Sequence, residues 1–335
     1  MDDYIHIAFG VSDPNRTYCK YVATTIYSII KHTNANIFIH ILSDSSISHE
    51  NIEKFMKMSE VYSFKFEIVN IPIENLKSEY NGIYCSIGTF LRFAVNELSQ
   101  DKIIYLDSDV LVTCDISKLW NININDYCLA AVKDCEDTRL RYINTRFYKK
   151  RGIDHIEYFN AGVIVFNCKK INQEMNLYRT AIKVLNENKK FNFYDQDVLN
   201  KIFRNKVKYL PAKFNYMIDS DHDYNILQGD AINHYSGIVK PWSTQNPNLI
   251  KIYYDFMKYT PWGNSIELMT LNLSEHIVNQ KKYHGFKWFI LYSDFPSMKF
   301  RVLCFFKSVL PNMITTKFFD SLMNMKLWLK FTLLG

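Results

Sequence analysis

Two carboxylates stand one residue apart in Asp107-Ser108-Asp109, directly after the apolar run 102–106. Side chains two apart on a strand project to the same face, so Asp107 and Asp109 can turn toward one hard divalent cation while Ser108 points away. The same triplet also arises by chance in acidic turns, and a solvated strand end is the simpler interpretation of the triplet alone. The chemistry that the spacing favours is metal-assisted binding of a phosphate group.

A second polar segment lies at residues 234–242 and has the pattern His-x-x-Gly-x-x-Lys-Pro-Trp. His234 offers an imidazole to a carboxylate-rich cation site, and one nitrogen among oxygens favours Mn²⁺ over Mg²⁺. Gly237 lets the backbone approach a diphosphate closely, and Lys240 offers a cation to the oxygens of a leaving group. A lone histidine is more often structural and a lone lysine solvated, so the argument depends on the combination.

With two further motifs, these segments resemble the retaining, metal-dependent glycosyltransferases of family eight, which include bacterial lipopolysaccharide galactosyl- and glucosyltransferases and glycogenin. The further motifs are 159–163, Phe-Asn-Ala-Gly-Val, and 195–197, Asp-Gln-Asp. All four motifs stand in the family's order between about Ile5 and Trp242. The resemblance implies an α/β fold with one GT-A-like nucleotide-binding domain over residues 1–265, a UDP-sugar donor and Mn²⁺ or Mg²⁺ as the metal.

The resemblance also implies roles for single residues. Asp107, Asp109 and His234 correspond to the metal ligands. Asp195 orders the donor sugar, Gln196 lies near the anomeric carbon, and Lys240 stabilises the departing UDP. The further donor contacts that it implies are Gly10, Val11, Ser12, Tyr18, Arg92, Ser108, Asn160, Ala161 and Gly237. It also implies that the small residues Ala161 and Gly162 leave room for the sugar ring.

Several of these residues have a purely structural alternative. Tyr18, the predicted stacking ring for uracil, also suits the core at the start of a helix. Arg92 also suits a surface ion pair, and Asn160-Ala161-Gly162 also suits a turn before a strand. Asp195 or Asp197 is a good N-cap for the helix predicted after them.

The predicted reaction moves galactose or glucose from a UDP-sugar to a saccharide hydroxyl with retention of anomeric configuration. Double displacement needs a carboxylate nucleophile, and Gln196 is a poor one, so attack on the face of the leaving group is the better hypothesis. Asp134 is predicted to shape the acceptor side. Three alternatives remain: a nucleotidyltransferase or phosphohydrolase, a protein- or self-glucosylating enzyme resembling glycogenin, and a non-catalytic membrane-associated protein with a relict site.

The elements that must position these residues alternate between strands and helices, as in a mostly parallel sheet. Ligands of such sheets lie beyond the carboxyl ends of the strands, where Val11, Asp107 and Asp109 emerge. Ser48 is predicted to cap the second helix. Strands are expected at 5–11, 35–42, 65–71, 102–106, 127–132 and 161–167, and helices at 18–31, 48–58, 86–98 and 198–203.

Composition agrees with a globular enzyme, because 48% of the 335 residues are apolar. The seven cysteines are scattered and odd in number, without a Cys-x-x-Cys pair, which predicts buried free thiols in a reducing compartment. The first residues show no signal-peptide pattern. We therefore expect a cytoplasmic protein.

The C-terminal part of the chain differs in charge from the rest. Residues 281–335 carry nine Lys or Arg against two Asp, whereas the remaining chain has 31 basic and 32 acidic residues and so no basic footprint for nucleic acid. Basic residues interleaved with Trp and Phe favour an anionic membrane surface, and no stretch is long and apolar enough to span a bilayer. We expect residues 266–335 to be a small helical segment that holds the enzyme on the inner face of the cell membrane, near a lipid-linked acceptor. The alternative is a set of small helices packed on the main domain.

Overall fold

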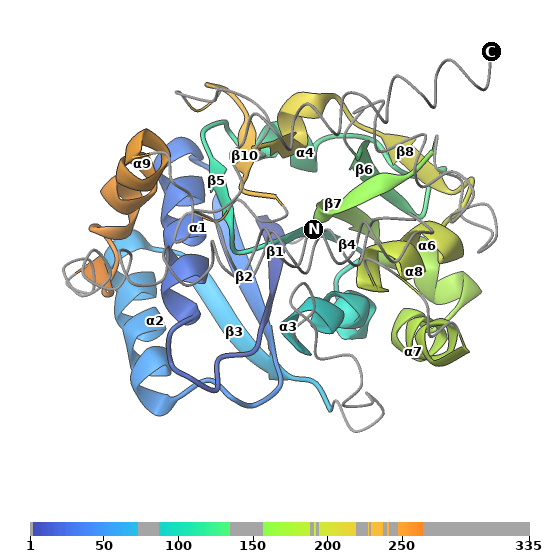
Figure 1. Ribbon diagram of the computed structural model, residues 1–335, viewed down its shortest axis with the longest axis horizontal. Coiled ribbons are helices and arrows are strands. Elements are labelled where there is room, and N and C mark those ends of the chain that lie inside the picture. Colours follow the sequence, from blue (N-terminus) through green and yellow to red (C-terminus); the bar gives the residue numbers. More distant parts are fainter. Residues whose placement is uncertain are drawn as a thin grey trace, which may run out of the picture. The chain divides into compact units, whose positions relative to one another are not determined.

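A seven-stranded sheet organises the part of the chain that the computed structural model describes (Figure 1). Its strand order is β3-β2-β1-β4-β7-β6-β8. The strands are β1 (Tyr4–Val11), β2 (Asn36–Ser43), β3 (Lys65–Asn70), β4 (Lys102–Leu106), β6 (Leu129–Lys133), β7 (Phe159–Asn167) and β8 (Val207–Tyr209). The described residues are 3–72, 87–134, 157–187, 191, 194–218, 227, 229–236, 240 and 247–263.

The sheet is mostly parallel, as predicted. β1 is parallel to both β2 and β4, β2 to β3, and β6 to β8, whereas β7 is antiparallel to its neighbours β4 and β6. The chain builds β1, β2 and β3 in one direction and then returns to place β4 on the other side of β1. This reversal is a topological switch point, and a ligand crevice is expected at the carboxyl ends of β1 and β4.

Helices cover both faces of the sheet, because its central strands are apolar on both sides (Figure 1). One face packs against α1 (Cys19–His32) and α2 (His49–Tyr62), through residues such as Ile26 and Phe55. The other packs against η2 (Leu91–Glu97), α6 (Cys168–Glu174), α7 (Leu177–Glu187) and α8 (Tyr194–Ile202). Farther out, α9 (Pro247–Met257) packs on α1.

A second, three-stranded sheet brings the two distant motifs together. It has the order β5-β10-β9, from β5 (Val110–Val112), β10 (Ile232–His234) and β9 (Tyr216–Met217). In the antiparallel β5–β10 pair, His234 lies opposite Val110, and the Tyr235 amide donates to the Asp109 carbonyl over 2.9 Å. Backbone pairing therefore carries His234 to the end of the Asp-x-Asp turn, although more than a hundred residues separate them.

Two predicted helices differ from the structure. The helix expected at 86–98 is one α-helical turn, α3 (Ile87–Phe90), followed by the 3₁₀-helix η2. The helix expected at 198–203 begins earlier, at Tyr194, so Asp195 and Gln196 lie inside its first turn and do not precede it. The β6 strand begins at Leu129, two residues later than predicted. Ser48 caps α2 as predicted, accepting from the Asn51 amide over 3.3 Å.

The structure bears on two further predictions. The four described cysteines, Cys19, Cys114, Cys128 and Cys168, are buried free thiols. Among the described residues, no helix has the length and apolar character needed to cross a membrane. Residues 266–335, for which we predicted a small helical segment, lie outside the described residues.

Candidate metal and donor site

Asp107, Asp109 and His234 converge as the sequence predicts. Each offers one ligand atom, and the three atoms lie within 4.8 Å of one another. Asp107 follows the last residue of β4, Asp109 precedes the first residue of β5, and His234 ends β10. Asp109 and His234 are buried and Asp107 is half-buried. Two carboxylates and one imidazole are donors that suit a divalent cation such as Mn²⁺.

The surroundings of Asp109 support a cation at this position. Its Oδ1 atom is buried without a hydrogen-bond partner, which costs free energy unless a ligand compensates. His234 Nε2 lies 3.4 Å from the same atom. The other carboxylate oxygen of Asp109, Oδ2, binds the Lys240 ammonium, which also donates to the Tyr235 carbonyl over 3.0 Å. Burial alone raises the pKa of Asp109, but the Lys240 charge holds that pKa well below its ordinary value, so the carboxylate stays ionised.

Gly162 permits the close approach of two of these ligands. A Cβ atom there would lie 2.3 Å from His234 Cε1, 2.8 Å from His234 Nδ1 and 3.0 Å from Asp107 Oδ2. The Gly162 carbonyl also accepts from the Asp107 amide over 2.8 Å. The imidazole and the carboxylate therefore occupy the space beside this glycine, where we predicted room for a sugar ring.

Arg92 connects the metal ligands to the predicted donor-sugar residues. Its guanidinium lies 2.8 Å from Asp107 Oδ1 through Nη2 and 3.1 Å from Asp195 Oδ2 through Nε. Nη1 donates to the Ala161 carbonyl over 2.5 Å, and the guanidinium stacks 4.9 Å from the centre of the Tyr105 ring. The side chain is buried, so the alternative of a surface ion pair is wrong.

Asp195 and Gln196 face this cluster from the first turn of α8. Burial raises the pKa of Asp195 to about 6, although Arg92 opposes the shift. Gln196 Oε1 accepts from the Ala161 amide over 2.9 Å, and Nε2 donates to Asp134 Oδ2 over 2.7 Å. Asp134, predicted on the acceptor side, therefore lies directly against Gln196.

The predicted donor contacts between Gly10 and Tyr18, at the end of β1 and in the loop after it, divide into core residues and residues near the site. Val11 is buried in the core, and a Cβ on Gly10 would lie 2.5 Å from the Gly88 carbonyl oxygen, so packing explains both residue types. Ser12 donates to Asp44 Oδ2 over 2.6 Å. Tyr18 is half-buried, and its hydroxyl meets Ser108 Oγ at 2.5 Å. The stacking of uracil on Tyr18 stays a prediction, as do the donor contacts of the other loop residues.

Two residues of this region were missed by the sequence analysis. Asn215, fully buried in η3 (Ala212–Asn215), accepts from His234 Nδ1 over 2.8 Å. Asp44, after β2, accepts from Ser12 and from Ser46 and so ties two loops together. No spacing rule points to either residue, because the contacts of Asn215 with His234 and of Asp44 with Ser12 form only when the chain folds. Gly237, which we predicted to contact the diphosphate, lies outside the described residues.

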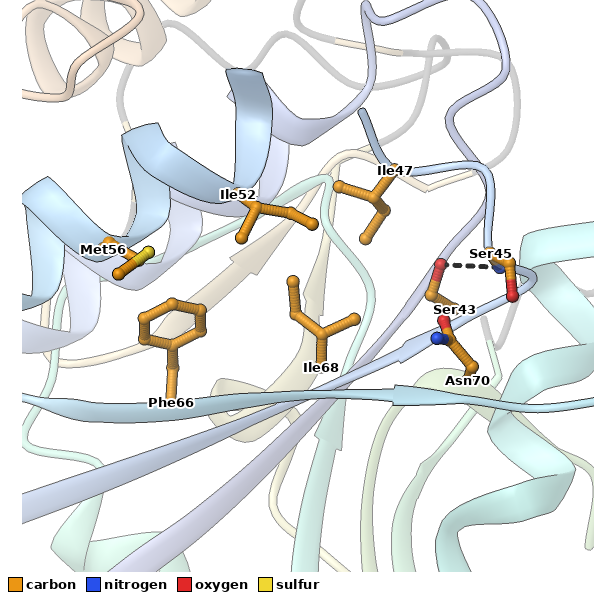
Figure 2. Close-up of a pocket in the computed structure, with 8 residues that line it drawn as sticks. All are labelled: Ser43, Ser45, Ile47, Ile52, Met56, Phe66, Ile68 and Asn70. Atoms are coloured by element: carbon orange, nitrogen blue, oxygen red, sulfur yellow. Dashed lines mark hydrogen bonds between the residues drawn. The ribbon is translucent and has the colours of Figure 1, made fainter. Parts of the chain in front are cut away.

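A groove of about 520 Å³ lies elsewhere, where α2 meets the β2–β3 edge (Figure 2). None of the eight residues that line it is titratable, so it supplies no acid or base. Ser43, Ser45 and Asn70 form its polar end. The remaining lining residues are apolar: Ile47, Ile52, Met56, Phe66 and Ile68.

Comparison with known proteins identifies the family. The sequence profile named Glycosyl transferase family 8 matches residues 6–246, which contain every residue of the site described above. The chain belongs to this family. The match ends before the basic C-terminal segment, so family 8 membership rests on the domain that carries the Asp-x-Asp turn and the 234–242 segment.

Family 8 relatives of this chain include curated bacterial transferases. A putative glycosyltransferase of Haemophilus influenzae is 33% identical over 236 residues, which cover 67% of this chain and 70% of the relative. The lipopolysaccharide 1,3-galactosyltransferase of Salmonella typhimurium is 25% identical over 314 residues, covering 87% and 90%. The lipopolysaccharide 1,2-glucosyltransferase of Escherichia coli is 26% identical over 275 residues, covering 77% and 79%. This chain is thus a family 8 glycosyltransferase related to lipopolysaccharide galactosyl- and glucosyltransferases.

Solved structures agree on the fold. The galactosyltransferase LgtC, crystallised with donor and acceptor sugar analogues, has a TM-score of 0.63 and 24% identity, and the match covers 77% of this chain and 96% of LgtC. This likeness confirms the GT-A-like α/β fold that the resemblance implied.

Proposed function

We propose that this family 8 enzyme transfers galactose or glucose from a UDP-sugar to a hydroxyl of a saccharide acceptor, with retention of anomeric configuration. The observation that carries the proposal is the convergence of Asp107, Asp109 and His234 within 4.8 Å, beside Lys240. A divalent metal bound there would neutralise negative charge on the diphosphate as it leaves. The named relatives that act on lipopolysaccharide support a lipid-linked glycan as the acceptor.

The side chains divide the work by position. Asp107 and Asp109 would hold the cation with His234, and Arg92 fixes Asp107 by an ion pair of 2.8 Å. Lys240 brings a second positive charge to the leaving-group side of the site. Asp195 orders the donor sugar while its carboxylate is held by Arg92 over 3.1 Å.

The contacts around Gln196 support attack on the leaving-group face. Both atoms of its amide are hydrogen-bonded within the protein, to Ala161 and Asp134. The next carboxylate along the helix, Asp197, is fully buried and accepts the Tyr158 hydroxyl over 2.6 Å. Neither residue presents a free carboxylate for a covalent intermediate. The leaving phosphate oxygen then takes the proton of the acceptor hydroxyl.

The experiment that tests the proposal measures UDP release from UDP-galactose, UDP-glucose and their N-acetyl counterparts, with Mn²⁺, with Mg²⁺ or with a chelator. We expect slow release from one hexose donor that requires metal. Asp109→Ala should lower it on the order of 100-fold or more, because the metal site loses a ligand. Asp126→Ala, which changes an exposed carboxylate, serves as the control and should leave the rate unchanged.

Other results identify the alternatives. Formation of UMP and sugar phosphate instead of UDP indicates a phosphohydrolase, and label that accumulates on the polypeptide indicates a self-glucosylating enzyme. If no metal supports either UDP binding or UDP release, the non-catalytic interpretation replaces the proposal.

A further inference from the structure

Three buried polar groups form a chain behind the metal ligand His234. The Gly162 amide donates to Asn160 Oδ1 over 2.9 Å, and Asn215 Nδ2 donates to the same oxygen over 2.8 Å. The Asn215 oxygen then meets His234 Nδ1 at 2.8 Å. The side chains of Asn160, Asn215 and His234 are at most 9% exposed, so water competes little for these hydrogen bonds.

The chain of bonds has only one consistent direction. A backbone N–H can only donate, so the atom of Asn160 that faces Gly162 is its oxygen. That oxygen can only accept, so Asn215 turns its NH₂ group toward Asn160 and its oxygen toward His234. The Asn215 oxygen also can only accept, and therefore His234 Nδ1 carries a proton.

The proton on His234 Nδ1 determines whether the other ring nitrogen, Nε2, donates or accepts. In the neutral imidazole with a proton on Nδ1, Nε2 keeps its lone pair. Nε2 lies 3.4 Å from Asp109 Oδ1, which is itself an acceptor without a hydrogen-bond partner. Two acceptor atoms therefore face each other with no proton between them, an arrangement that a shared cation satisfies.

We infer that Asn215 is a positioning residue for the metal: it fixes the Nδ1–H tautomer and the ring orientation of His234, and thereby turns Nε2 toward the cation. The inference rests on the proposed function for the metal itself. The Asn215 amide also joins Asn160, the predicted donor-sugar contact, to the metal ligand His234.

Metal binding in the full-length chain provides the first test. Titration with Mn²⁺, followed by the electron paramagnetic resonance signal of the free ion, should show affinity about 10- to 100-fold weaker for Asn215→Ala, the usual cost of losing a partner behind a metal ligand. Asn215→Asp keeps an acceptor for Nδ1–H and should recover part of this loss. Asn96→Ala is the matched control, because it removes another buried amide, whose hydrogen bond over 2.8 Å is to Asn172 and not to a metal ligand.

The tautomer of the metal-free protein provides the second test and needs no activity. Long-range ¹H–¹⁵N correlation spectra of the chain labelled on histidine should show His234 at pH 8 with its proton on Nδ1, with His234→Gln used to assign the signal. In Asn215→Ala the same ring should show both tautomers, because no acceptor then selects between them.

The outcomes separate this inference from the proposed function. A ring that carries its proton on Nε2 in the unmodified chain overturns the inference. A folded Asn215→Ala chain that binds Mn²⁺ as tightly as Asn96→Ala also overturns it. If neither the unmodified chain nor any variant binds Mn²⁺, the metal site of the proposed function is wrong, while the spectra still decide whether Asn215 sets the tautomer.

Discussion

At the scale of single residues, the site depends on the absence of a side chain at Gly162. Gly162 stands in a motif that we interpreted as room for a sugar, yet its missing Cβ makes room for His234 and Asp107. The glycine is thus a requirement of the metal ligands themselves. The ion pairs of Arg92 also depend on the fold, because its two carboxylate partners, Asp107 and Asp195, lie in separate segments of the chain.

Gly162→Ala should therefore weaken Mn²⁺ binding about 10- to 100-fold, because a Cβ 2.3 Å from the imidazole forces the ring away from Asp109. The displaced packing should also lower the free energy of unfolding by about 1–3 kcal/mol. Mn²⁺ titration and denaturant unfolding measure the two effects. The control is Gly229→Ala, whose new Cβ has no atom within 4 Å. Equal metal affinity in the two variants would show that His234 is not held where the structure places it.

At the scale of elements, one buried carboxylate anchors the helix that faces the Asp-x-Asp turn. Asp13, 1% exposed, accepts from the backbone amides of Thr17 and Tyr18, each over 2.7 Å, and from that of Cys19 over 3.3 Å. It also accepts from the Asn51 side chain on α2 over 2.9 Å. Asp13 is thus fully used in starting α1, and Tyr18, the residue before this helix, reaches Ser108.

Asp13→Ala should lower the free energy of unfolding by about 2–3 kcal/mol, since it leaves several buried donors without an acceptor. Ser48→Ala, which removes a single cap bond of 3.3 Å at the start of α2, should cost only about 0.5–1 kcal/mol. Urea unfolding followed by circular dichroism measures both. Similar losses in the two variants would contradict the central role of Asp13.

At the scale of the whole molecule, charge is distributed unevenly between two parts of the chain. The basic excess lies in residues 281–335, whereas the part that carries the site is close to neutral. A polybasic, aromatic segment is attracted to anionic lipid with about 1 kcal/mol per Lys or Arg near the surface. This charge agrees with the expectation from the sequence that residues 266–335 hold the enzyme peripherally at the inner face of the membrane, close to a lipid-linked acceptor.

Replacement of Lys281, Lys282 and Lys287 by Gln should therefore lower partitioning to vesicles that contain phosphatidylglycerol, on the order of 100-fold for three lysines. Raised salt should weaken binding of the unmodified chain because it screens the lipid charge. Co-sedimentation measures both. A control chain with Gln at three exposed lysines of the family 8 domain, Lys57, Lys169 and Lys213, loses the same charge and should bind as the unmodified chain does. Equal losses in the two chains would assign binding to net charge alone.

The sequence by itself predicted six of the seven strands of the main sheet, the family, and the three residues that converge as a candidate cation site. Apolar runs and helical periodicity are local properties, and a motif such as Asp107-Ser108-Asp109 keeps its chemistry in one short segment. The same local view failed at α8, whose start at Tyr194 draws Asp195 and Gln196 into the helix. It also failed at η2, a 3₁₀-helix buried in the core where we expected an α-helix.

Only the tertiary structure decided how the ligands are held. The pairing of β5 with β10 brings His234 to Asp109, and the fold around it supplies Asn215 and the space beside Gly162. The physical reason is that hydrogen bonds and close contacts depend on distances of a few ångströms between segments far apart in the chain. Residue type and spacing name the groups that do chemistry, while the directions in which those groups point are set by neighbours that the sequence does not place.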